Sequence, residues 1–106
     1  MATIDYSPGA ISDLEQIGDY IELELSSPVA AINTVNKIQD SIDNLSTFPL
    51  MGTMLSSIVG VDTDYRFLVC GKYLAFYRTD EVIVYVDRIL YGKRDYIAIL
   101  LPGIIE

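Results

Sequence analysis

The feature that most limits the fold is a set of three apolar segments in the second half of the chain, rich in β-branched and aromatic residues typical of strands. The segments are Tyr65–Val69, Tyr73–Arg78 and Val82–Leu90. The connections between them, Cys70–Lys72 and Thr79–Glu81, have the length of hairpin turns. Parallel strands need a crossover of a dozen or more residues. The sequence therefore predicts three antiparallel strands in a meander.

Two helices are predicted ahead of these strands, and each opens on a Ser–Pro pair. Ser7 and Ser27 can cap the N-termini, and Pro8 and Pro28 suit the first helical position, where no N–H is needed. Apolar residues then recur at helical spacing: Ala10, Leu14, Ile17, Ile21 and Leu25, followed by Ala31, Val35, Ile38, Ile42 and Leu45. Acidic residues mark the expected solvent side of the first helix: Asp13, Glu15, Asp19, Glu22 and Glu24. The short connection between the helices predicts an antiparallel helical hairpin, which ends at Phe48-Pro49.

The remaining segments complete a single α+β domain over residues 1–106. Ala2–Tyr6 is predicted to be a short strand and Leu50–Asp64 a loop. Lys93–Leu100 is predicted to be a short final helix, stopped by Pro102-Gly103. The predicted order is β-α-α-β-β-β, with this short helix last. Because helices and strands are segregated, the helical hairpin should pack on one face of a small, mainly antiparallel sheet.

Side-chain alternation predicts which strand residues share a face of the sheet. On the middle strand one face holds Tyr73, Ala75 and Tyr77, and the other holds Leu74, Phe76 and Arg78. On the last strand one side holds Val82, Val84, Val86 and Arg88. Both faces are therefore expected to be fairly apolar. Arg88 would stand at the far end of an apolar face and could reach solvent there.

Charge is distributed unevenly along the chain. The formal net charge is −8, and ten of the acidic groups but only one basic group lie in residues 1–65. The other basic residues lie on or beside the predicted meander: Arg66, Lys72, Arg78, Arg88, Lys93 and Arg94. An acidic protein gains little from long-range steering toward nucleic acid. A working surface for an anionic partner, if there is one, is expected on the meander.

Cysteine, histidine and the termini limit the class of protein further. Cys70 is the single cysteine and the chain has no histidine. An intramolecular disulfide cannot form, and we expect Cys70 to be a small buried residue at a strand end. No signal peptide is recognisable, and the apolar tail Ile97–Leu101 is far too short to span a bilayer. We expect a cytoplasmic protein with no membrane segment, metal or cofactor.

Several segments in this order resemble the RelE/ParE superfamily of bacterial type II toxins, and the resemblance covers nearly the whole chain. They are Ala10–Ile17 with Asp19-Tyr20-Ile21, Ser27–Ala31, Leu45–Pro49 with Gly52, Tyr65-Arg66, Tyr73–Tyr77 and Arg88–Tyr96. The resemblance implies a small toxin, neutralised by a cognate antitoxin with which it forms an oligomer.

One branch of this superfamily, the RelE-like toxins, cleaves messenger RNA on the ribosome. Cleavage needs a group that accepts a proton and cations that stabilise a developing phosphorane. Comparison with the branch's pattern gives Arg66 and Arg94 as cations at matching positions, and Arg88 is a further candidate. The pattern's other positions hold leucine in this chain: Leu68, Leu74 and Leu100. Alternatively, Arg66 and Arg88 pair only with carboxylates such as Asp64 and Asp87.

The other branch, the ParE-like toxins, is thought to act on DNA gyrase, and its pattern looks closer to this chain. The Tyr-Leu-x-Phe-Tyr strand at Tyr73–Tyr77 and the Gly-Lys-Arg-Asp-Tyr end at Gly92–Tyr96 carry this preference. We therefore expect a ParE-like toxin that binds a protein target and is not an enzyme. The alternatives are a RelE-like endoribonuclease with Arg94, Arg66 and Arg88 as catalytic candidates, and a degenerate member that is not toxic.

Toxins of this kind expose an apolar groove that an antitoxin helix or strand fills. The residues expected to bind the partner are Tyr73, Tyr77, Tyr96, Ile97, Leu100 and Leu101. Three of them have a simpler interpretation. Tyr73 and Tyr77 share a strand face and could line the core, and Tyr96 could pack the last helix onto the sheet.

Overall fold

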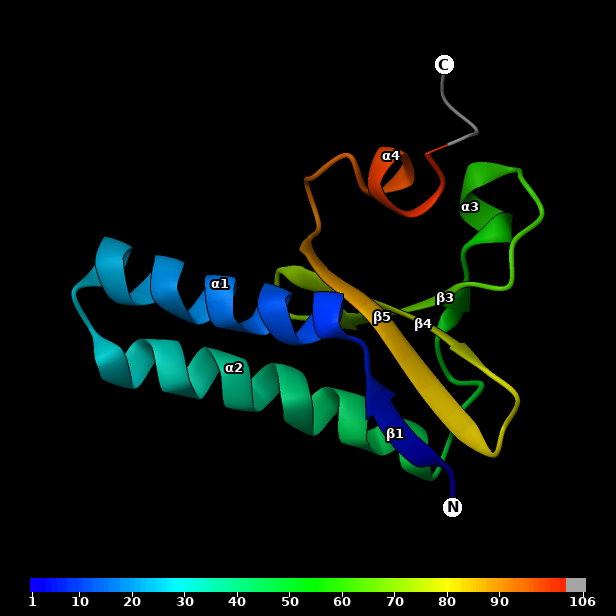
Figure 1. Cartoon of the computed structure of the whole chain (residues 1–106), viewed down its shortest axis with the longest axis horizontal. Coiled ribbons are helices and arrows are strands. Elements are labelled where there is room, and N and C mark those ends of the chain that lie inside the picture. The colour runs from blue at the N-terminus through cyan, green and yellow to red at the C-terminus, as the bar shows by residue number, and fades with distance from the viewer. Residues whose placement is uncertain (103–106) are drawn as a thin grey trace.

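The two Ser–Pro pairs start helices, as predicted. In the computed structural model, which describes residues 1–102, helix α1 spans Pro8–Leu25 and helix α2 spans Pro28–Asp43. Ser7 Oγ accepts a hydrogen bond from the Ala10 N–H at 3.0 Å, and Ser27 Oγ accepts one from the Ala30 N–H at 3.1 Å. Figure 1 shows the two helices side by side as an antiparallel hairpin. A short 3₁₀ turn, Asn44–Ser46, follows α2.

The strands form one mixed sheet in the order β1-β5-β4-β3-β2. Their bounds are Thr3–Tyr6 for β1, Thr53–Met54 for β2, Arg66–Cys70 for β3, Tyr73–Thr79 for β4 and Ile83–Tyr91 for β5. The pairs β2–β3, β3–β4 and β4–β5 are antiparallel, which confirms the predicted meander. β1 lies parallel to β5, because α1 and α2 carry the chain back across the sheet.

The prediction that Leu50–Asp64 is a loop is wrong in part. This segment contains β2 and a four-residue helix, α3, at Ser56–Val59. Leu55 connects the two and is fully buried, and its N–H donates to the Tyr65 carbonyl at 3.0 Å. Elements of two and four residues are too short to show a hydrophobic period, so periodicity could not reveal them.

The final helix, α4, spans Tyr96–Leu100 and is shorter than the predicted Lys93–Leu100. Asp95 caps it by accepting a hydrogen bond from the Ala98 N–H at 3.4 Å. The preceding residues form a turn in which the Arg94 N–H donates to the Tyr91 carbonyl at 2.9 Å. The helix was predicted to stop at Pro102-Gly103, and Gly103 lies outside the described residues.

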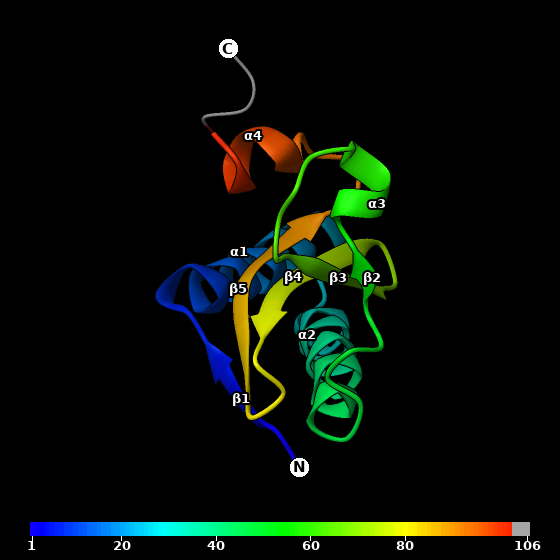
Figure 2. The same ribbon diagram turned by 90° about the vertical axis from the view of Figure 1, so that its right-hand side faces the viewer.

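Two apolar clusters lie on opposite faces of the sheet. The first, the helix-side core, fills the space between the helical hairpin and the sheet, and its fully buried members include Ile42, Leu45, Tyr77, Val84 and Val86. The second, the far-side cluster, has Leu55, Phe76 and Leu90 at its centre. Figures 1 and 2 show α3 and α4 together on this far side, away from α1 and α2. The helical hairpin packs on one face of the sheet, as predicted, and α3 and α4 cover the other face.

A β-bulge changes the predicted faces of β5. The register shifts between Phe76 and Tyr77, so that Tyr77 pairs with Val86 but Phe76 pairs with Arg88, and Asp87 is the extra residue. The prediction that Arg88 shares a face with Val84 and Val86 is therefore wrong. Beyond the bulge, side chains again alternate between the two faces of the sheet, but shifted by one residue from the predicted pattern.

The hairpin also differs from the simple amphipathic prediction at two positions. Asp13 was placed on the solvent side, yet it is only 6% exposed. Leu25 was placed in the apolar stripe, yet it is 64% exposed. The second difference arises because the connected ends of α1 and α2 extend beyond the sheet, as Figure 1 shows, so that Leu25 has no strand beneath it.

Candidate functional site

Arg88 is held by a buried carboxylate, and its side chain is only partly exposed. Its Nε donates to Asp13 Oδ2 at 2.8 Å and its Nη2 donates to Asp13 Oδ1 at 2.9 Å. The Ile89 N–H also donates to Asp13 Oδ2 at 2.8 Å. The hydrogen bond to Asp13 raises the pKa of Arg88 above its ordinary value. This bidentate pair joins α1 to β5 at the bulge, so both acceptor oxygens of Asp13 are already used.

Asp87 pairs with Arg78 instead of with Arg66 or Arg88. Arg78 Nε donates to Asp87 Oδ2 at 2.9 Å, and the Arg78 guanidinium carbon lies 5.4 Å from the centre of the Tyr65 ring. Arg66 has no carboxylate partner within residues 1–102. Its Nη1 donates to the carbonyls of Leu50 at 3.2 Å and Gly52 at 3.0 Å, so this arginine holds the segment ahead of β2 against β3.

Arg94 differs from Arg66 and Arg88 because its side chain makes no hydrogen bond or ion pair with any residue in the part of the chain that the structure describes. It is exposed and lines an open cleft of about 1250 Å³, here called the hairpin cleft. The cleft lies where the helical hairpin extends past the sheet. Its other basic residues are Lys37 and Lys72.

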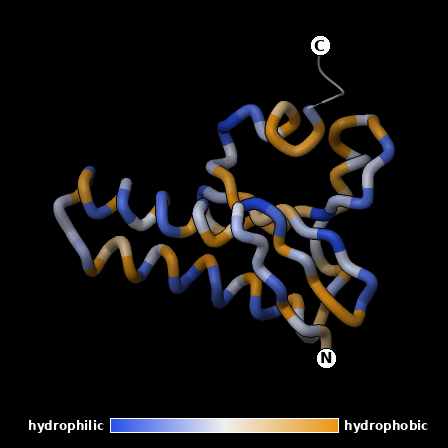
Figure 3. The backbone as a smooth tube through the Cα atoms, in the orientation of Figure 1, coloured by the Kyte–Doolittle hydropathy of each residue, from blue (hydrophilic) through white to orange (hydrophobic). Residues whose placement is uncertain are grey.

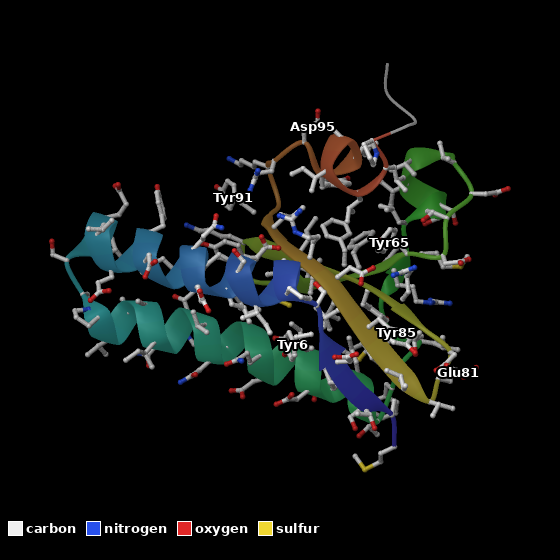
Figure 4. All side chains as sticks on the ribbon, viewed as in Figure 1. Tyr6, Tyr65, Glu81, Tyr85, Tyr91 and Asp95 are labelled. Atoms are coloured by element: carbon white, nitrogen blue, oxygen red, sulfur yellow. The ribbon has the colours of Figure 1, made fainter. Side chains whose placement is uncertain are left out.

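Three tyrosines line the hairpin cleft. Tyr73 and Tyr91 pack edge to face, with ring centres 5.9 Å apart, and Tyr20 reaches the cleft from α1. Figure 4 shows Tyr91 at the end of β5, next to the turn that leads to Asp95. Burial raises the pKa of the Tyr73 hydroxyl. Tyr73 was among the predicted partner-binding residues, whereas Tyr20 was not. The position of a tyrosine on a helix does not reveal that the helix extends beyond the sheet.

Cys70 lies at the buried end of the hairpin cleft, as expected of a strand-end cysteine. Its residue is 5% exposed, and burial raises the pKa of its thiol to about 11. A thiol with so high a pKa is almost entirely protonated near neutral pH and is a poor nucleophile.

The three catalytic candidates do not share one site. Arg94 lines the hairpin cleft, Arg66 lines a separate pocket with Arg78 and Tyr65, and Arg88 lines neither of them. The leucines at the other pattern positions are also divided. Leu68 packs on the helix-side core, while Leu74 and Leu100 pack on the far-side cluster.

Tyr77 is part of the core and is not accessible to a partner on the folded chain. It is fully buried, its hydroxyl donates to the Pro49 carbonyl at 2.9 Å, and it accepts from the Gly52 N–H at 2.9 Å. A side chain on Gly52 would collide with this hydroxyl, since an added Cβ would lie 2.5 Å from it. We therefore correct the prediction that Tyr77 lines a partner surface.

The partner-binding candidates at the end of the chain cover the far side of the sheet. Tyr96 packs on Phe76 with ring centres 5.2 Å apart, and Leu100 and Leu101 pack on the same cluster. The simpler interpretation of Tyr96 as a packing residue is thus confirmed. Ile97 is half-buried. The apolar far face of the sheet is therefore largely covered.

The fold and this site define a class: a small α+β domain with an open cleft lined by tyrosines and with Arg66, Arg88 and Arg94 on separate surfaces. The chain belongs to the ParE toxin family of type II toxin–antitoxin systems, parDE, whose family model matches residues 4–96. It is therefore a ParE-type toxin of a toxin–antitoxin system, which implies an antitoxin partner.

A solved structure described as the chromosomal ParDE TA system from P. aeruginosa has the same fold. The TM-score is 0.74 at 22% sequence identity, and the match covers 88% of this chain and 98% of that one. A search of the curated proteins gave no significant match. No helix among residues 1–102 is long and apolar enough to cross a membrane.

Proposed function

We propose that this chain inhibits growth by binding a protein target, DNA gyrase by resemblance, and that a cognate antitoxin neutralises it in the cytoplasm by forming an oligomer with it. The observation that carries the proposal is that the three candidate arginines, Arg66, Arg88 and Arg94, lie on separate surfaces. Stabilising a phosphorane requires cations that converge on one phosphate. Here Arg88 is occupied by Asp13, Arg66 is bound to carbonyl oxygens, and Arg94 stands on another surface.

The hairpin cleft is the surface we assign to partner contacts. It combines the apolar faces of Tyr20, Tyr73 and Tyr91 with Arg94, which has no ion-pair partner among residues 1–102. Protein interfaces are enriched in Tyr and Arg. Tyr96, Ile97, Leu100 and Leu101, in and after α4, remain proposed partner contacts. Tyr77 is no longer proposed as a contact, because it is fully buried.

Gyrase supercoiling measured with the purified chain tests the proposed target. We expect the chain to inhibit supercoiling, Arg94→Ala to weaken inhibition about tenfold, and the control Lys93→Ala to change it less than about twofold. The factor of ten corresponds to roughly 1.4 kcal/mol, within the range for a contact residue truncated to alanine. Unchanged supercoiling at a dose that stops growth would sink the gyrase proposal.

The two alternatives give different outcomes. Cleavage of messenger RNA in a translating extract, lost in Arg94→Ala, would support a RelE-like endoribonuclease. Expression without growth arrest, from a chain that still binds its antitoxin, would identify a degenerate member. A short neighbouring gene for a small DNA-binding protein would supply the antitoxin needed for the last comparison.

A further inference from the structure

Two turns meet at one end of the sheet, where they line the hairpin cleft. One joins β3 to β4 and carries Lys72, and the other follows β5 and carries Arg94. The Gly92 N–H donates to the Lys72 carbonyl at 2.9 Å, and the Arg94 N–H donates to the Tyr91 carbonyl at 2.9 Å. Gly92 permits this close approach, since an added Cβ would lie 3.2 Å from the Lys72 carbonyl oxygen. Lys72 and Arg94 are therefore held on neighbouring turns.

Tyrosine rings stand beside these two cations. Tyr73 pairs with Tyr91 in the register of β4 and β5, and their ring centres are 5.9 Å apart. Tyr91 is 38% exposed, and Tyr20 of α1 is 62% exposed. Burial raises the pKa of the Tyr73 hydroxyl, and the nearby hydroxyls of Tyr20 and Tyr91 raise it further. We call the group at the end of the sheet the basic corner: Lys72, Tyr73, Tyr91 and Arg94.

The cations of the basic corner are not used to hold the fold. Neither has an ion-pair partner among residues 1–102, whereas Arg78 and Arg88 pair with carboxylates. Both side chains are exposed. Figure 3 shows that the turn between β5 and the apolar α4 is strongly hydrophilic. The two cations are thus available to an anionic group that enters the cleft.

The carboxylates that line the hairpin cleft come from the helices and leave its sheet end positive. Asp13 is occupied by Arg88. Asp40 stands three residues after Lys37 on α2, close enough for their charges to offset in part. Glu24 lies at the connected end of the hairpin, which extends beyond the sheet in Figure 1. An acidic ligand is attracted at the basic corner and repelled near Glu24, which would orient it.

We propose that the basic corner binds an acidic segment of the target protein that also carries an aromatic side chain. Its carboxylates would pair with Lys72 and Arg94, and its aromatic side chain would lie on Tyr91. Arg and Tyr are enriched among the residues that dominate binding at protein interfaces. The proposal rests on the proposed function, since it names the kind of target segment that the hairpin cleft recognises.

The charge of the whole chain favours a peptide segment over nucleic acid as the occupant. The formal net charge is −8, which opposes the approach of a long polyanion. A segment with a few carboxylates can instead meet the two cations at short range. The pair Tyr73 and Tyr91 gives such a segment an apolar surface at the same place.

The test uses a short synthetic peptide with a central tryptophan between aspartate and glutamate residues. The chain has no tryptophan, so the fluorescence of the peptide reports binding to the whole chain without a label. We expect saturable binding. The same peptide with asparagine and glutamine in place of the acids should bind about tenfold more weakly, as the loss of two exposed ion pairs would allow.

Matched variants locate the binding surface. Lys72→Gln and Arg94→Gln should each weaken binding about threefold, the effect of one exposed ion pair. The control Lys93→Gln, next to Arg94 but outside the cleft lining, should leave binding nearly unchanged. Tyr91→Ala should weaken binding about tenfold. Its control is Tyr85→Ala, because Tyr85 also lies on β5, is also 38% exposed and does not line the cleft.

Four results would overturn the proposal. The first is equal weakening by Arg94→Gln and Lys93→Gln, which would mean that overall charge alone attracts the peptide. The second is equally tight binding of the uncharged peptide. The third is displacement of the peptide by ATP more readily than by the same peptide with phenylalanine for tryptophan, which would make a nucleoside phosphate the occupant. The fourth is a dimer in sedimentation that Arg94→Gln dissolves, which would make a second copy the occupant.

The peptide experiment does not use gyrase, so the two proposals can fail separately. Peptide binding by a chain that leaves supercoiling unchanged would support the basic corner and overturn gyrase as the target. Inhibition of supercoiling by a chain that does not bind the peptide would support gyrase and overturn the basic corner.

Discussion

The two faces of the sheet are both covered by helices, but the covers are built in different ways. The helix-side core lies under α1 and α2, of 18 and 16 residues, and Asp13 ties α1 to β5. The far-side cluster lies under α3 and α4, of four and five residues. Helices this short are marginal by themselves and depend on what they pack against.

The long helices therefore help to hold the fold together, whereas the short helices mainly cover one face of the sheet. The long helices bring their own caps, a periodic apolar stripe and an ion pair to the sheet. The short helices bring a few apolar side chains to a surface already set by Phe76 and Leu90. We therefore expect the strand residues of the far side to matter most for stability there.

The largest expected effect is that of Phe76→Ala. Phe76 is fully buried at the centre of the far-side cluster, and such a truncation typically costs about 3–5 kcal/mol. Urea unfolding would measure the loss in the free energy of unfolding. The control Phe48→Ala removes a ring that is 63% exposed and should cost less than about 0.5 kcal/mol. Similar losses for both would mean that the far-side cluster is not a core.

The second largest effect is expected for Asp13→Ala, which should lower the free energy of unfolding by about 2 kcal/mol. The substitution leaves Arg88 and the Ile89 N–H without their acceptor. The estimate is below the usual cost of breaking a buried pair, since the Arg88 side chain is 33% exposed. The exposed Asp19→Ala on the same helix is the control in the same unfolding experiment. If Asp13→Ala were as harmless as Asp19→Ala, the ion pair would not tie the hairpin to the sheet.

Tyr77→Phe should have a smaller effect, about 1–2 kcal/mol. It removes one hydroxyl that donates to the Pro49 carbonyl and accepts from the Gly52 N–H, and leaves both backbone groups unpaired. Thermal or urea unfolding would measure it against Tyr85→Phe, whose hydroxyl lies on an exposed side chain. A loss no larger than that of the control would show that the hydroxyl does not hold the segment before β2.

The smallest effect is a pH dependence from Tyr6 on the helix side. Burial, with the nearby Asp43 carboxylate, raises the pKa of Tyr6 from 10.0 to about 12 in the folded chain. The folded state thus holds the proton more tightly, and stability is full below pH 10 and falls as pH rises toward 12. Tyr6→Phe should flatten the fall by about 1 kcal/mol or less, after allowance for solvent screening. An unchanged pH profile in Tyr6→Phe would assign the fall to other groups.

Much of the helix side could be predicted from the sequence. Ser7-Pro8 and Ser27-Pro28 set the starts of the helices, and the short turns after Cys70 and Thr79 required antiparallel strands. These features are local, because a cap or a tight turn depends on a few neighbouring residues. The family resemblance followed from the same segments.

The bulge, the partners of the arginines and the far-side cover could not be predicted in this way. Asp13 and Arg88 lie 75 positions apart. The β-bulge shifts Arg88 by one residue in the alternation of β5, and no periodicity in the sequence shows that Asp13 on α1 would meet it there. The burial of Tyr77 likewise depended on Pro49 and Gly52 from a segment without a pattern.

The sequence by itself determined the two long helices, the strand meander, their order and the family, because these depend on local propensity and on segments that keep their spacing. The tertiary structure alone decided which charges pair with one another. Arg66 and Arg88 are used to hold the fold, while Arg94 lines the hairpin cleft with no ion-pair partner among residues 1–102. The physical reason is that an ion pair or a groove depends on distances between side chains, and only folding brings distant residues within reach of one another.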